Sequence, residues 1–186
     1  ADTMIDGGCF FTTPEPDGPG LALHTSYDGS QLDAAVSVLR AHPDQVNPIT
    51  VSIGGIDAAD VIAETCNFDA SCVARSGLRD ELGRDLDRVL EGLQAAAPRA
   101  QIILVAFYNP FTVDVPTSDR LWHRHYTTAL KAAAARHGAR IADVSGLLDE
   151  HDVCDLTFLC SSGDPHPTDL GYRLIADEVF EAAGYE

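Results

Sequence analysis

The sequence is poor in positive charge and in long apolar stretches. It carries 12 Lys and Arg residues against 29 Asp and Glu, which gives a formal net charge of −17 at pH 7. A chain with this charge repels polyanions, so binding to DNA, RNA or an anionic membrane surface is not expected. The longest uncharged apolar stretch lies near Gln101–Val113 and falls well short of the ~20 residues that a membrane-spanning helix needs. The sequence therefore predicts neither a nucleic-acid-binding protein nor a transmembrane one.

Signatures of metal and phosphate binding are also missing. None of the five cysteines forms a Cys-x-x-Cys pair, so zinc-ribbon and thioredoxin-like folds have no support. The segment Gly18-Pro19-Gly20 lacks the preceding strand and following helix of a phosphate-binding loop. His123 and His125 are two residues apart on a predicted helix, where they would face different directions. We therefore predict no metal and no cofactor.

The cysteines nevertheless form two pairs that are close in sequence, namely Cys66 with Cys72 and Cys154 with Cys160. Each pair lies in a segment that we predict as a loop, so each could close a short ring worth about 2 kcal/mol. The alternative is that all five are reduced thiols of a reducing compartment. We favour the two local disulfides and with them an extracellular, secreted protein. We expect the opening residues not to be a signal peptide, because an acid stands where such a signal has basic residues. Cys9 is then left unpaired.

Helical and strand-like patterns alternate along most of the chain. Helical stripes at Gln31–Arg40, Leu78–Leu93, Ser118–His137 and after Thr168 alternate with apolar runs at Ile49–Ile53, Gln101–Tyr108 and Arg140–Val144. Thr168 is predicted to cap the last of these helices. This order is typical of an α/β domain with a parallel sheet, and continuous apolar strands indicate a sheet covered on both faces. Residues 1–28, rich in Gly and Pro, are predicted to be irregular. We expect one domain over residues 1–186 with a three-layer α/β/α fold.

Sites in such folds lie beyond the carboxyl ends of the strands. Three stretches qualify, namely Gly54–Asp57, Tyr108–Pro110 and the loop from Cys154 to His166. In the last of these, two prolines restrict the backbone around His166, just before the final helix. Asp164 is close enough to orient this imidazole and to stabilise an imidazolium. The alternative is an ordinary surface loop in which both side chains are solvated.

Two further motifs connect these stretches to a known family. The segment Val51–Asp57 reads VSIGGID, and Asp164–Tyr172 reads DPHPTDLGY. The first is similar to the third sequence block of the SGNH/GDSL hydrolases, and the second resembles their last block. The segment Gly29–Ala35, the Tyr108–Pro110 strand end and the cysteine pairs resemble the secreted actinobacterial esterase/lipase branch. The resemblance runs from about Thr3 to the end of the chain.

This resemblance implies a flavodoxin-like fold and an esterase or lipase that acts on small-molecule, lipid or carbohydrate esters without a cofactor. In that family a Ser of a Gly-Asp-Ser block attacks the ester carbonyl, and N–H donors stabilise the oxyanion. By resemblance, His166 is the general base and Asp164 orients it. Gly54, Gly55 and Ile56 match the oxyanion-hole region. The family has Asn at position 56, and an Ile side chain cannot donate a hydrogen bond.

The nucleophile block itself is missing, because no Gly-Asp-Ser sequence occurs in the chain. Asp28-Gly29-Ser30 has these residues in another order and at the start of a later helix, so we do not expect Ser30 to be the nucleophile. The resemblance implies that the first strand is missing too, and that the missing segment would hold the partner of Cys9. Three interpretations follow. The chain is a Ser-His-Asp hydrolase without its Ser block, an inactive remnant that acts as a binding or interaction protein, or a fold completed by a separate N-terminal segment or by self-association.

Overall fold

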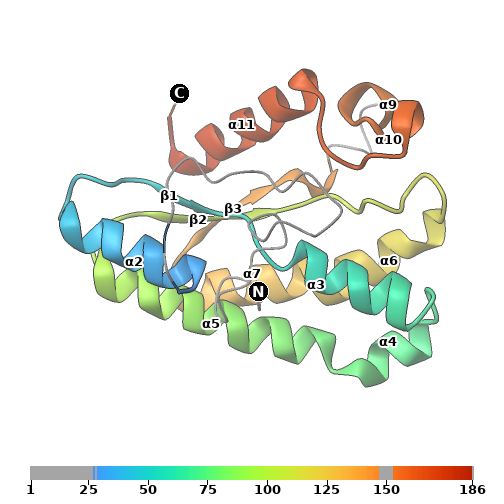
Figure 1. Ribbon diagram of the computed structural model, residues 1–186, viewed down its shortest axis with the longest axis horizontal. Coiled ribbons are helices and arrows are strands. Elements are labelled where there is room, and N and C mark those ends of the chain that lie inside the picture. Colours follow the sequence, from blue (N-terminus) through green and yellow to red (C-terminus); the bar gives the residue numbers. More distant parts are fainter. Residues whose placement is uncertain (1–26, 28, 147–152, 186) are drawn as a thin grey trace.

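The computed structural model describes residues 27, 29–146 and 153–185. Figure 1 shows how helices and strands follow one another in these residues. The helices are α2 (Gln31–Ala41), α3 (Gly55–Ala59), α4 (Ala70–Ser76), α5 (Leu78–Ala96), α6 (Asp119–Trp122), α7 (Thr128–His137), α9 (Val153–Leu156), α10 (Leu159–Ser162) and α11 (Asp169–Ala183). The strands are β1 (Ile49–Val51), β2 (Ile102–Ala106) and β3 (Arg140–Asp143). Two π-helical segments, η1 (Asp60–Thr65) and η3 (His123–Thr127), and two 3₁₀ turns, η2 (Pro116–Ser118) and η4 (Val144–Gly146), complete the description.

The strands form a parallel sheet in the order β1-β2-β3 within the described ranges. In its register, Leu104 lies between Val51 and Ile141. The central strand β2 is buried at every position, whereas β1 and β3 each contain an exposed residue. The predicted parallel α/β architecture is confirmed, but continuous burial holds only for β2. The expected absence of a first strand concerns residues outside the described ranges and stays a prediction.

Helices cover both faces of this sheet (Figure 1). Successive residues of a strand point to opposite faces. Accordingly, Leu104 belongs to the large core shared with the helices α5 and α7, while Ile103 and Val105 belong to a smaller core. Ile175 and Val179 of α11 pack against that smaller core. The sheet therefore separates a thick helical layer from a thinner one formed by α11.

The helix α5 carries the strongest apolar stripe of the sequence, and the structure confirms it. All six of its apolar stripe residues are buried: Leu78, Leu82, Leu86, Val89, Leu90 and Leu93. Burial of each such side chain contributes about 1.5–3 kcal/mol relative to exposure. Asp80 and Glu81 stand in the first turn, where negative charge interacts favourably with the helix dipole.

The helical run predicted for Ser118–His137 is present but is not a uniform α-helix. It consists of α6, the π-helical η3 and α7. Trp122, the last residue of α6, and Tyr126, in η3, are both buried. Gly138 ends the run in a left-handed conformation with φ 64°, which glycine adopts without steric cost.

The loops predicted around both cysteine pairs are wrong, because those segments are largely helical. Cys66 ends η1 and Cys72 lies in α4, while Cys154 and Cys160 lie in α9 and α10. Short helical turns bring the Cα atoms of Cys66 and Cys72 to 5.5 Å from each other and those of Cys154 and Cys160 to 5.2 Å, which are separations that a disulfide can bridge. Both predicted disulfides are present. Cys9 and nearly all of the segment 1–28 lie outside the described residues.

No helix in the described part of the chain is long and apolar enough to cross a membrane.

Candidate active site

The first side of the candidate site is the diglycine turn that follows β1. Gly54 has φ 82° and precedes the first turn of α3, where its carbonyl accepts from the amide of Ala58 at 3.1 Å. A Cβ at this position would lie 3.2 Å from the Leu82 side chain. Both the left-handed backbone and the close approach therefore favour glycine. A Cβ at Gly55 would lie 4.0 Å from the side chains of both Trp122 and Tyr126.

Tyr126 connects this turn to the end of β2. Its hydroxyl donates to the carbonyl of Ile53 at 3.4 Å and accepts from the amide of Phe107 at 3.3 Å. Trp122 donates from Nε1 to the carbonyl of Phe107 at 3.0 Å. Burial raises the pKa of Tyr126 to about 12, so its hydroxyl stays protonated. The carboxyl ends of β1 and β2 are thus held together by one buried phenol.

The end of β2 in turn contacts the segment that carries His166. Tyr108 is 4% exposed, and its hydroxyl donates to the carbonyl of Pro165 at 2.5 Å. The next residue, Asn109, donates from Nδ2 to Ser118 and Asp119, each at 2.6 Å. These contacts fix the chain as it leaves the strand. The diglycine turn and the His166 loop therefore lie at the same edge of the sheet.

The His166 loop is also held from its other side, by the helices α9 and α10. The carbonyl of His166 accepts from the amide of Phe158 at 3.1 Å, and Pro167 forms an isolated antiparallel bridge with Thr157. The amide of Thr168 donates to the carbonyl of Leu156 at 2.8 Å. The Cys154–Cys160 disulfide closes the same segment. The loop is thus supported by backbone hydrogen bonds as well as by its prolines.

The end of this loop is also the start of α11. The Thr168 side chain caps the helix, accepting from the amide of Gly171 at 3.3 Å, as the sequence predicts. Gly171 is buried against the carbonyl of Leu156, where a Cβ would clash. The junction of loop and helix therefore has little freedom to shift.

His166 and Asp164 are in direct contact. Nδ1 of the imidazole lies 2.5 Å from Oδ1 of the carboxylate, which also accepts from the His166 amide at 2.9 Å. The hydrogen bonds from the backbone and the side chain of His166 lower the pKa of Asp164. With a proton on Nδ1 donated to this carboxylate, Nε2 keeps its lone pair. No described residue contacts Nε2 by a hydrogen bond, and the His166 side chain is 61% exposed. Nε2 can therefore accept a proton from a hydroxyl that comes within hydrogen-bond distance of it.

The remaining predicted site residues are placed as follows. Ile56, in the first turn of α3, is 57% exposed and offers no side-chain donor. Ser30 is buried, and its hydroxyl donates to the carboxylate of Asp33 at 2.8 Å while accepting from the Asp33 amide at 3.0 Å. This capping box occupies the hydroxyl at the start of α2.

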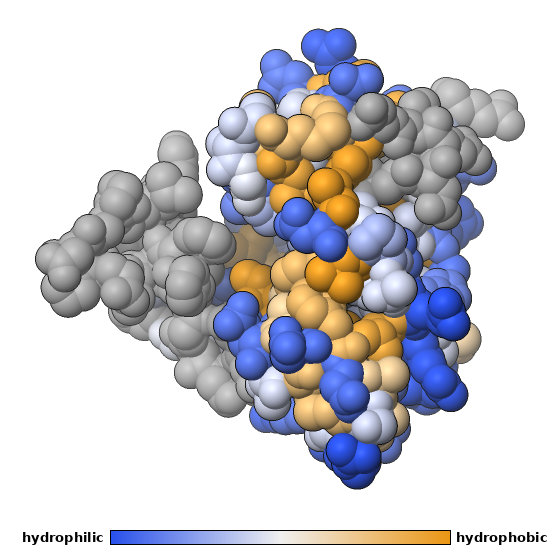
Figure 2. All heavy atoms as spheres, turned by 90° about the vertical axis from the view of Figure 1, so that its right-hand side faces the viewer, coloured by the Kyte–Doolittle hydropathy of each residue, from blue (hydrophilic) through white to orange (hydrophobic). Residues whose placement is uncertain are grey.

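Exposed apolar side chains occur near this edge of the sheet. Figure 2 faces the end of the molecule toward which the strands run, and an apolar band crosses it from top to bottom. Ile56, Val113 and Phe158 are exposed apolar residues in segments that follow the strands or flank the His166 loop. Among the described residues, no group of three or more His, Cys, Asp or Glu side chains could hold a metal ion.

Sequence reasoning missed the hydrogen bonds that two tyrosines make at this edge, Tyr108 and Tyr126. Tyr108 stands at the predicted strand end, yet its hydrogen bond joins residues 57 positions apart. Tyr126 lies within the helical run predicted for Ser118–His137, and its bond to Ile53 spans 73 positions. The one available signal is the phenol itself, because a buried Tyr usually directs its hydroxyl to a partner.

An α/β fold with an Asp-oriented imidazole at the carboxyl edge of its sheet is an arrangement suited to acyl transfer. Comparison with known proteins agrees with this class, since residues 20–174 match the model of the GDSL-like lipase/acylhydrolase family. The chain therefore belongs to that family. It is similar to Lipase 2 of Streptomyces coelicolor, with 24% identity over 206 residues that cover 90% of this chain and 70% of the relative.

Proposed function

We propose that the protein is a serine ester hydrolase, an esterase or lipase, in which His166 is the general base and Asp164 the residue that orients it. The observation that carries this proposal is the 2.5 Å contact between Nδ1 and the carboxylate, together with an Nε2 atom to which no described residue hydrogen-bonds. The family to which the chain belongs, and a relative named as a lipase, support ester hydrolysis. The substrates we propose are small-molecule, lipid or carbohydrate esters.

In this mechanism the nucleophilic hydroxyl comes from outside the described residues. As the hydroxyl oxygen bonds to the ester carbonyl carbon, its proton passes to Nε2 of His166. The imidazolium then returns this proton to the departing alkoxide, which leaves an acyl-enzyme. Water attacks the acyl-enzyme in the same way and releases the acid. Throughout, the ionised Asp164 stabilises the positive charge that appears on the ring.

We propose that the protein is secreted. Its two disulfides suit an oxidising compartment and would be rare in a reducing cytosol.

The proposal is tested by hydrolysis of p-nitrophenyl acetate by the protein and by His166→Ala. Removal of the general base should reduce the rate by about 10²–10⁴-fold. The matched control is His137→Ala, which removes another Asp-paired imidazole, one that lies between two helices. It should keep the hydrolysis rate of the folded protein within about threefold, since it has no contact with the site. Equal turnover by His166→Ala and the parent protein would remove His166 from the mechanism.

A second candidate function is binding without catalysis, and Ile56 favours it. Its exposed alkyl side chain stands where the family has an oxyanion donor, and loss of one such donor costs about 10²–10³-fold in rate. A fluorophosphonate probe separates the two functions. A serine of this chain labelled only in the folded protein supports the hydrolase, whereas an unlabelled protein without esterase activity supports the binding function.

A further inference from the structure

We propose that Tyr108 is a positioning residue for the general base, because its hydroxyl fixes the peptide unit between Pro165 and His166. The inference rests on the role proposed for His166. The hydroxyl of Tyr108 donates to the carbonyl of Pro165 at 2.5 Å, and the amide at the other end of the same peptide unit donates to Asp164 at 2.9 Å. Because a peptide unit is planar, fixing its carbonyl also fixes the direction of its N–H.

This peptide unit determines the geometry of the whole pair. Oδ1 of Asp164 accepts from the His166 amide and lies 2.5 Å from the ring nitrogen Nδ1. A rotation of the peptide plane would turn the amide away from the carboxylate. The carboxylate would then lose one of the two hydrogen bonds that place it against the ring. Tyr108 therefore acts on the ring through the backbone, without touching it.

Tyr108 also connects the pair to the rigid part of the fold. The other backbone hydrogen bonds of the loop go to the segment of α9 and α10, through Leu156 and Phe158. Those short helices pack chiefly against one another and against α11. Tyr108, by contrast, lies two residues after the central strand β2, which is buried along its whole length. Its hydroxyl therefore ties the His166 loop to the strand end that also holds the diglycine turn through Tyr126.

The environment of Tyr108 keeps it in the donating form. Its ring is buried and lies against that of Phe107, with the ring centroids 4.7 Å apart. Burial raises the pKa of Tyr108, and the nearby Tyr172 and Asp164 raise it further. The phenol thus remains a hydrogen-bond donor throughout the pH range in which an ester hydrolase works.

The test is Tyr108→Phe, which removes one oxygen and keeps the buried ring. We expect kcat for p-nitrophenyl acetate to fall about 10- to 100-fold with KM changed less than threefold, the size expected from a displaced catalytic group. We also expect the NMR signals of the His166 ring, and their titration with pH, to differ from those of the parent. Tyr126→Phe removes a buried hydroxyl that has no contact with the loop, so it should leave the His166 ring signals in place.

The two readouts separate this proposal from the proposed function. If the His166 signals and their titration are the same in Tyr108→Phe and in the parent, the positioning role is wrong, whatever the activity. If those signals shift while the parent itself hydrolyses no ester, the positioning role stands and the hydrolase function fails. A third measurement needs no variant, because the Tyr108 hydroxyl proton of the parent should exchange slowly with water. Fast exchange of that proton would overturn the proposal.

Discussion

The described residues contain two His–Asp pairs whose surroundings differ. In one, Nε2 of His137 lies 2.9 Å from Oδ1 of Asp87, and in the other, Nδ1 of His166 lies 2.5 Å from Oδ1 of Asp164. The first imidazole is 13% exposed and lies between the helices α5 and α7, whereas the second is 61% exposed at the edge of the sheet. The pairs therefore share their chemical groups but not their access to a substrate.

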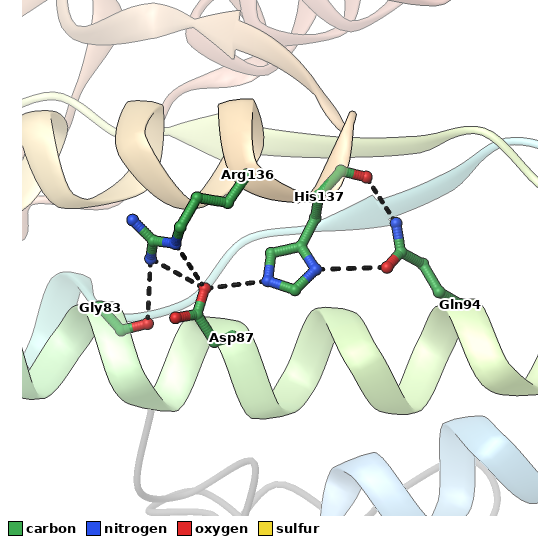
Figure 3. Close-up of polar contacts among 5 residues, drawn as sticks. All are labelled: Gly83, Asp87, Gln94, Arg136 and His137. Carbon is green, nitrogen blue, oxygen red and sulfur yellow. Dashed lines mark hydrogen bonds and ion pairs between the residues drawn. The ribbon is translucent and has the colours of Figure 1, made fainter.

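In the half-buried pair of His137 and Asp87, both ring nitrogens of the imidazole face a partner (Figure 3). Nδ1 of His137 faces the side-chain oxygen of Gln94 at 3.3 Å, and the Gln94 amide donates to the His137 carbonyl at 2.5 Å. Arg136 donates twice to the same oxygen of Asp87, at 3.1 and 2.8 Å. Because both ring nitrogens are occupied, this imidazole has none left to accept a proton from a substrate. The cluster instead links two helices.

The comparison shows that an Asp beside a His does not by itself define a catalytic base. What distinguishes the exposed pair is the second ring nitrogen, to which no described residue hydrogen-bonds, on a ring that is 61% exposed at the carboxyl edge of a parallel sheet. Hydrogen bonds to both nitrogens turn the same side chains into a helix-to-helix contact. The difference can be tested by making the same change in each pair.

The largest expected difference comes from replacing each Asp by Asn. Asp164→Asn removes the charge that orients and stabilises the ring, so hydrolysis of p-nitrophenyl acetate should fall by about 10²-fold or more. Its urea midpoint should stay near that of the parent, because Asp164 is exposed. Asp87→Asn should instead lower the stability and leave the activity of the folded protein intact. It weakens a partly buried hydrogen-bond network at a cost of about 1–3 kcal/mol. The comparison fails if Asp87→Asn reduces activity more than Asp164→Asn does.

A smaller difference is expected between the two disulfides. Replacing Cys154 and Cys160 together by Ser opens the ring whose backbone bonds to the His166 loop, and the equivalent change at Cys66 and Cys72 opens a ring elsewhere. Each double variant should lose about 2 kcal/mol of stability, the value for a short closed loop. Only the first should also lower kcat, by a few-fold, because the exposed pair depends on that segment for its position. Equal kcat values in both double variants would show that the His166 loop does not need its disulfide.

Local patterns were sufficient to predict the elements that position the site. The apolar stripe of α5, the buried β2 and the Thr168 cap are each encoded within a few residues, so periodicity and capping rules identify them. The pair of His166 and Asp164 is also local, since the two residues are two positions apart. The short helices α3 and α4 were missed because their polar, cysteine-containing sequence has too few apolar positions to show a stripe.

The missed contacts are long-range in sequence. Tyr108 reaches Pro165 across 57 positions, and His137 reaches Asp87 across 50. No spacing rule connects such residues, since only the folding of the sheet and helices brings them together. From the sequence, the cluster of Figure 3 therefore could not be distinguished from charges on a solvated helix face. Sequence reasoning finds a site when its chemistry lies in one loop and misses the supports that come from distant elements.

The smallest expected difference lies in the pH dependence of stability. Burial disfavours the charged form of Asp87, but hydrogen bonds from Arg136 and His137 outweigh it and lower its pKa. A carboxylate whose pKa is lower in the folded state stabilises the fold above its unfolded pKa, about 3.9, and loses that contribution as the pH falls through its folded pKa. We therefore expect urea unfolding from pH 6 to pH 2 to show that the difference in the free energy of unfolding between the parent and Asp87→Asn becomes smaller as the pH falls. For Asp164→Asn the difference in the free energy of unfolding from the parent should be small at every pH, because solvent screens an exposed pair. A stability difference for Asp87→Asn that stays constant with pH would mean that this partly buried carboxylate makes no charge-dependent contribution to the link between α5 and α7.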